Sequence, residues 1–173
     1  MTTLMRTITI ISLLSAAVSV NAQQPDWVAL PLVAGQAFDE SSPELSKKIY
    51  LYQRCAGQQL AMSTVVAEAS ADLEKAFTES AMSLSQAAAL DRANLARQRT
   101  GQDPDIENLS KSTLEAIVQL YDQYMKWVNN NYLLNGSYFE NDEDFQIEMK
   151  LCSAASQMAR LSIQALVEED SQP

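Results

Sequence analysis

Apolar residues recur at every third or fourth position over most of the chain after residue 42, which is the spacing of one face of an α-helix. One stripe with regular 3-4-3-4 spacing consists of Leu114, Ile117, Tyr121, Tyr124 and Val128. A second stripe, nearer the C-terminus, consists of Phe145, Met149, Cys152, Ser156, Ala159, Ile163 and Leu166. The pattern predicts an all-α fold, and the short connections between its segments predict an antiparallel four-helix bundle.

Helix start signals divide this region into segments. The first helix is expected to begin at Ser42 and Pro43, an N-cap residue followed by proline. Ser70, within a break that we place at residues 67–72, is the next N-cap, and it opens a second helix over residues 71–99. Because neither Pro nor Gly occurs from residue 58 to residue 100, one continuous helix is the alternative, although that length is unusual.

Two further helices complete the predicted bundle domain, residues 42–170. Gly101 is expected to end the second helix, and Asp103 with Pro104 to begin the third. The third helix ends in the asparagine-rich stretch 129–131 and the turn at 135–137. Asn141 and the acidic residues at 142–144 open the last helix, because negative charge is favourable at a helix N-terminus.

Residues 23–41 contain two prolines, one glycine and no sustained helical period, so we predict an irregular, extended N-terminal arm. The apolar residues of this segment are Trp27, Val28, Leu30, Leu32, Val33 and Phe38. They are too numerous for a solvated linker and favour an arm that lies on the bundle surface. A segment offered to a partner and a short strand are the alternatives.

Residues 1–22 have the pattern of a cleaved secretory signal peptide. Arg6 precedes an apolar run over residues 8–20, and Val20 and Ala22 stand at positions −3 and −1 of a cleavage site. The run is too short for a bilayer, which needs about 20 apolar residues. We therefore expect an exported protein, periplasmic or extracellular, without a stable membrane anchor. A buried apolar helix is the alternative.

The two cysteines, Cys55 and Cys152, favour a structural disulfide, because an even cysteine count is typical of exported chains with such bonds. Cys55 lies 12 residues after Pro43, and Cys152 lies 10 residues after Asp142. Both therefore fall near the middle of the first and last helices, which are adjacent and antiparallel in the expected bundle. The sequence predicts a bond between these helices, with two buried thiols as the alternative.

Charge and composition exclude several functions. The formal net charge is −10, which argues against a nucleic-acid partner and against docking on anionic lipid. Histidine is absent, which excludes Ser-His-Asp and Cys-His nucleophile systems and His-ligated zinc. The sequence assigns no catalytic residue, no metal ligand and no cofactor.

Aromatic residues provide the candidate sites. Tyr121, Tyr124 and Trp127 of the third predicted helix either line an apolar pocket between helices or pack in the core. Tyr132 and Tyr138, in the aromatic and acidic stretch 129–145, either form a surface for a cation, an amine or a partner, or close the end of the core.

Polar residues also flank Cys55. Tyr50, Tyr52, Arg54, Gln58 and Gln59 either form a polar site beside the disulfide or lie at the helix edge with their polar ends in solvent.

Because catalytic motifs are missing, the sequence favours a non-catalytic interaction protein of the envelope or the extracellular space, with an inhibitor-like, immunity-like or chaperone-like role and another protein as its partner. The alternative is a small-ligand binding or sensor bundle that uses Tyr121, Tyr124 and Trp127. An enzyme that uses carboxylates, with or without a metal near residues 142–144, is a third hypothesis. The identity of the partner and the oligomeric state stay open.

Overall fold

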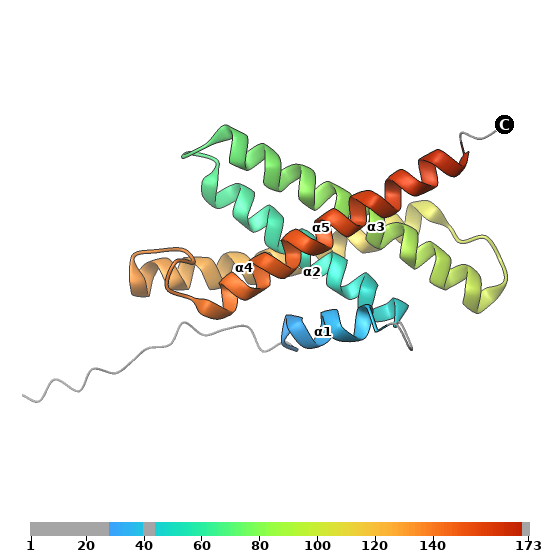
Figure 1. Cartoon of the computed structure of the whole chain (residues 1–173), viewed down its shortest axis with the longest axis horizontal. Coiled ribbons are helices and arrows are strands. Elements are labelled where there is room, and N and C mark those ends of the chain that lie inside the picture. The colour runs from blue at the N-terminus through green and yellow to red at the C-terminus, as the bar shows by residue number, and fades with distance from the viewer. Residues whose placement is uncertain (1–27, 40–43, 171–173) are drawn as a thin grey trace, which may run out of the picture.

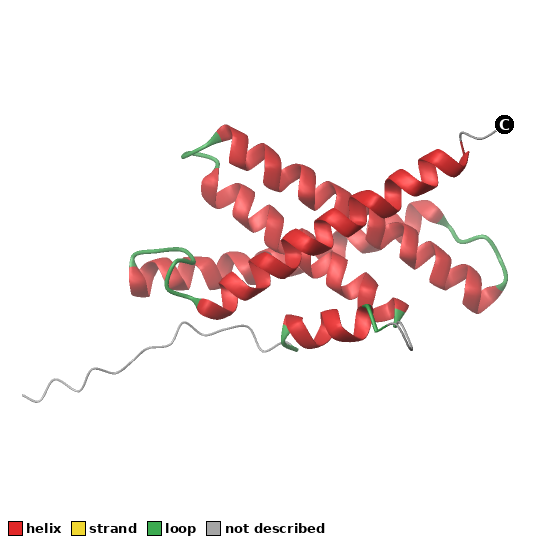
Figure 2. Ribbon diagram, viewed as in Figure 1, coloured by secondary structure: helices red, strands yellow, loops and turns green. Residues whose placement is uncertain are grey.

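The computed structural model describes residues 28–39 and 44–170, apart from the side chains of residues 169 and 170. Within these ranges all regular structure is helical, which confirms the predicted all-α class (Figure 2). The helices are α1 (Leu30–Ala37), α2 (Leu45–Val66), α3 (Ala71–Thr100), α4 (Ile106–Asn135) and α5 (Glu143–Asp170). The proposed signal peptide lies outside the described residues. No helix in the described ranges is long and apolar enough to cross a membrane.

The long helices form three layers. In Figure 1, α2 and α3 run antiparallel as a hairpin, α5 crosses in front of this hairpin, and α4 crosses behind it. Both α4 and α5 pack against α2 and α3, whereas their own backbones do not come into contact. The regular antiparallel four-helix bundle is therefore not confirmed, because a bundle would pack α4 and α5 side by side.

Helix α2 lies at the centre of the molecule and contacts each of the other four helices. Residues 51–59 are buried without interruption, so this part of the helix has no solvent face. Gly57 stands where α2 meets α4. A Cβ atom added there would lie 2.9 Å from Leu120 Cβ and 2.9 Å from the backbone nitrogen of Tyr121. The missing side chain is thus what allows the two backbones to approach closely.

Local capping chemistry sets the helix ends. The Ser70 side chain accepts a hydrogen bond from Leu73 N at 3.3 Å, which confirms the predicted break between the first two long helices. Gly101 ends α3 and Gly136 ends α4, each with a left-handed φ that glycine adopts freely. The expected start at Ser42 and Pro43 lies outside the described residues.

The third long helix begins slightly later than predicted. Asp105, and not Asp103, is the N-cap of α4, since its carboxylate accepts from Asn108 N at 3.0 Å. Asp103 instead pairs with Arg97 Nε at 3.2 Å on the surface.

The prediction of an irregular arm is wrong for residues 30–37, which form α1. Pro31 stands in the first turn of this helix, where its missing N–H costs no helical hydrogen bond, so the proline starts the helix and does not prevent it. Leu30, Val33 and Ala37 share one face at 3-4 spacing and are buried against α2 and α5. The arm thus docks on the other helices through this face.

The predicted disulfide is present. It joins Cys55 of α2 to Cys152 of α5, with the two Cα atoms 5.0 Å apart. Both residues are fully buried where the two helices cross. The bond therefore fixes the front layer to the central helix.

Candidate functional site

A closed polar cluster surrounds Arg54, which precedes the disulfide residue Cys55 and is completely buried. Its Nη2 forms an ion pair with Glu148 Oε1 of α5, and its Nη1 donates to the backbone carbonyl of Val28. Its Nε donates to the hydroxyl of Tyr124 of α4 at 3.1 Å. That hydroxyl in turn donates to Glu148 Oε2 at 2.5 Å. One guanidinium thus connects α2, α4, α5 and the backbone before α1.

Burial dominates the electrostatics of this cluster. It raises the pKa of Glu148 above 4.5, although the charge of Arg54 opposes the shift. Burial, followed by the nearby carboxylate of Glu148, raises the pKa of Tyr124 well above 10, so the phenol remains a neutral donor. The three side chains bind one another, which is typical of a network that fixes one packing arrangement.

Aromatic rings pack beside this cluster. Trp127 lies edge-on to Phe145, with centroids 5.0 Å apart, and stacks near Tyr124 at 6.0 Å. The carboxylate of Asp142 accepts from Trp127 Nε1 and from Asn131 Nδ2, both at 2.8 Å, and from the backbone N–H of Phe145 at 2.9 Å. Asp142 therefore caps α5 and holds the aromatic cluster. No group of three or more His, Cys, Asp or Glu in the described ranges is placed to hold a metal ion.

The five aromatic residues singled out from the sequence lie in different environments of the described structure. Tyr124 and Trp127 are core residues, Tyr121 is half-buried, and Tyr132 is exposed and stacks on Tyr138 with ring centroids 4.6 Å apart. None of the five lines either of the two hollows described next.

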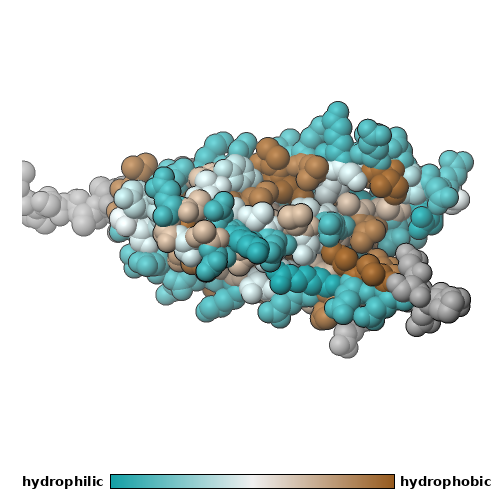
Figure 3. Space-filling model, turned by 90° about the horizontal axis from the view of Figure 1, so that it is seen from above, coloured by the Kyte–Doolittle hydropathy of each residue, from teal (hydrophilic) through white to brown (hydrophobic). Residues whose placement is uncertain are grey.

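An apolar groove lies where α3 ends and α4 begins, and α5 forms its third side. Its volume is about 400 Å³. It is lined by Gln86, Ala89, Leu90, Ala93, Ile106, Leu109, Ser110 and Ile163. In Figure 3, which views the molecule from above, brown apolar side chains gather from the middle to the right, over this end of the helices. Ile106 is 58% exposed and Leu166, one turn beyond Ile163, is 45% exposed.

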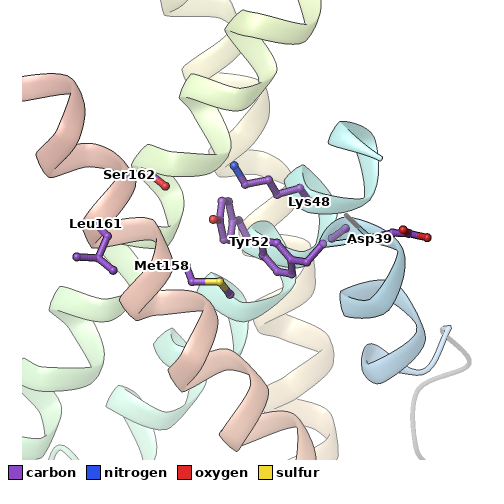
Figure 4. Close-up of a pocket in the computed structure, with 8 residues that line it drawn as sticks. Asp39, Lys48, Tyr52, Met158, Leu161 and Ser162 are labelled. Atoms are coloured by element: carbon purple, nitrogen blue, oxygen red, sulfur yellow. The ribbon is translucent and has the colours of Figure 1, made fainter. Parts of the chain in front are cut away.

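The second hollow lies between α1, α2 and α5 and has a volume of about 490 Å³ (Figure 4). We call it the Tyr52 hollow. It is lined by Ala37, Phe38, Asp39, Lys48, Tyr52, Met158, Leu161 and Ser162. The Tyr52 hydroxyl is buried, and no described residue accepts a hydrogen bond from it. Burial and the Asp91 carboxylate raise its pKa to about 12, although a hydrogen bond from the Ser162 hydroxyl lowers it.

Sequence reasoning named Tyr52 and Arg54 as neighbours of the disulfide but missed Glu148. The signal was available, because Glu148 lies three residues after Phe145 and four before Cys152, which places it on the buried face of the last helix. An acid at such a position requires a buried cation, and Arg54 supplies it.

Comparison with protein-family models, curated proteins and solved structures finds no match to this chain.

Proposed function

We propose that the chain is an exported, non-catalytic interaction protein that binds an amphipathic helix of a partner protein in the apolar groove. The observation that carries the proposal is that the apolar stripes of two helices continue past the packed core. Leu114 and Leu166 stand on these stripes, yet they are 55% and 45% exposed. An apolar groove bordered by an exposed apolar side chain such as that of Ile106 is typical of a protein-binding face.

The shape of the groove favours a helix as its occupant. Residues 86–93 of α3 form one side over two helical turns, which is about 10 Å of length. Ala89 and Ala93 are small and leave space, whereas Leu90 and Ile106 provide larger apolar walls. Gln86 and Ser110 are the polar residues of the lining. A groove of this form accepts side chains at helical spacing from the apolar face of a partner helix.

Two features support the exported part of the proposal. The disulfide between Cys55 and Cys152 is typical of proteins that fold in an oxidising compartment. The first 22 residues have the charge and hydrophobicity pattern of a secretory signal.

A photo-crosslinking amino acid at position 166 tests the groove, with position 133 as the matched control. Leu133 is also an exposed apolar residue, 80% exposed, but it lies at the opposite end of α4. We expect position 166, and not position 133, to give a discrete adduct in extracts of the producing cells. Peptide mapping should place the crosslink in an amphipathic helix of the partner.

A synthetic peptide of that mapped helix then gives the decisive comparison. We expect Ile106→Asp to weaken its binding at least tenfold without lowering the melting temperature, since Ile106 is exposed. Equal crosslinking at positions 166 and 133, or no adduct at all, would overturn the proposal. An adduct at the mass of two chains would also overturn it, because the occupant would then be a second copy.

A further inference from the structure

The Tyr52 hollow contains a buried hydroxyl whose hydrogen-bond donor is unused within the described part of the chain. Tyr52 is 1% exposed, and no described residue accepts a hydrogen bond from its hydroxyl. The large majority of buried side-chain polar atoms in proteins have a hydrogen-bond partner. In Figure 4 the hydroxyl points toward the space between Met158 and Ser162 of α5. The unsatisfied group therefore faces a hollow that can hold a ligand atom.

The remaining walls of the hollow are mostly apolar. Ala37 and Phe38 come from the end of α1, and Met158 and Leu161 come from α5. A volume of about 490 Å³ lies within the range of small-molecule sites, roughly 300 to 1,000 Å³. An occupant thus needs an apolar body with a polar atom at one end.

The charges around the hollow favour a neutral occupant. The ammonium of Lys48 lies 5.4 Å from the centre of the Tyr52 ring, but it is already paired with Asp91 Oδ2 at 3.1 Å. The side chain of Asp39 extends away from Tyr52 in Figure 4. Because the Lys48 charge is already compensated by Asp91, an anionic ligand would gain little from it.

We propose that the Tyr52 hollow binds a small neutral molecule with an apolar body and one carbonyl-type oxygen, which accepts a hydrogen bond from the Tyr52 hydroxyl. Met158 and Leu161 contact the apolar body, and the Ser162 hydroxyl lies beside the acceptor oxygen. Since the pKa of Tyr52 is about 12, the hydroxyl keeps its proton and remains a donor at neutral pH. This site is separate from the apolar groove, so an experiment can contradict one of the two proposals without affecting the other.

Two probes of similar size test the proposal on the full chain: propiophenone, which has the carbonyl, and propylbenzene, which lacks it. Binding is followed by NMR of ¹³C-labelled methionine methyl groups, with Met158 as the reporter at the hollow and Met82 of α3, which is exposed, as the reference. We expect propiophenone to shift the Met158 signal and to bind about tenfold more tightly than propylbenzene, because only the ketone satisfies the buried hydroxyl.

The variant Tyr52→Phe keeps the ring and removes only the hydroxyl, so it should bind both probes equally. Tyr50→Phe is the matched control, since Tyr50 lies on the same helix outside the hollow, and it should keep the tenfold preference. The proposal is overturned if neither probe shifts Met158 or if Tyr52→Phe retains the preference. Tighter binding of the anion 3-phenylpropanoate than of propiophenone would also overturn the neutral class of ligand.

Discussion

Tyr124 and Tyr52 are both almost completely buried, but their hydroxyl groups differ in hydrogen bonding. The Tyr124 hydroxyl accepts from Arg54 and donates to Glu148, inside a cluster that closes on itself. The Tyr52 hydroxyl donates to no described residue and faces a hollow. A buried donor without an acceptor costs about 1–3 kcal/mol of stability. Tyr124 therefore stabilises the packing of the helices, whereas the Tyr52 hydroxyl is available to donate a hydrogen bond to a ligand.

The disulfide ought to give the largest effect, because it fixes α2 to α5 beside the closed cluster. It joins residues 97 positions apart, and the chain-entropy model assigns such a loop about 4–5 kcal/mol. We expect the double variant Cys55→Ala and Cys152→Ala to lose about that much free energy of unfolding, measured by urea denaturation. A loss below about 1 kcal/mol would mean that the closed cluster holds the crossing without the bond.

Removing the acid of the closed cluster is the next strongest test. Glu148→Ala leaves the buried guanidinium of Arg54 without its carboxylate, and breaking a buried pair in this way costs about 3–5 kcal/mol. Glu143→Ala, in the first turn of the same helix, is the exposed control and should change stability by about 0.5 kcal/mol or less. If the two variants are equally stable, the cluster contributes nothing.

The pH dependence of stability provides a smaller effect. Burial raises the pKa of Glu148 above 4.5 in the folded protein, so its contribution to stability is fully present below about pH 4.5. This contribution is lost as the pH rises through the raised pKa. We therefore expect the stability of the natural chain, relative to the non-titrating variant Glu148→Gln, to fall as the pH rises from 4 to 8. A rise in relative stability over that range would show that the pKa of Glu148 is lowered, and that the charge of Arg54 outweighs burial.

Some of these features follow from the sequence because they depend on local chemistry. Ser70, Gly101 and Gly136 end or begin helices through their own side chains or backbone freedom, so the breaks were predictable. The pairing of Cys55 with Cys152 was predictable because they are the only two cysteines and each lies on or beside an apolar stripe.

The layered packing of the long helices and the presence of α1 could not be predicted from the sequence. A 3-4 spacing identifies the apolar face of a helix but not its neighbour, which is why Leu114 was expected in the core and is exposed. The crossing of α2 and α4 depends on Gly57, whose role appears only once Leu120 lies against it. The prolines of residues 23–41 counted against a helix there, although Pro31 stands in a first turn, where proline is compatible with a helix.

The candidate sites show the same limit. The residues near Cys55 were visible as a polar group, but sequence spacing does not tell whether a hydroxyl meets a carboxylate or a hollow. Tyr52 meets the hollow and Tyr124 the carboxylate of Glu148. That distinction depends on the elements opposite each ring, which come from distant parts of the chain.

The most direct test of this account is the same substitution at both tyrosines, with the free energy of unfolding measured by urea denaturation at pH 7. Tyr124→Phe removes a hydroxyl that binds Arg54 and Glu148, so we expect a loss of about 1–3 kcal/mol. Tyr52→Phe removes a hydroxyl that donates to no residue in the described part of the chain, so we expect no loss, or a gain of about 1 kcal/mol. An equal loss at both positions would contradict the account, because the Tyr52 hydroxyl would then already donate a hydrogen bond to an acceptor within the protein.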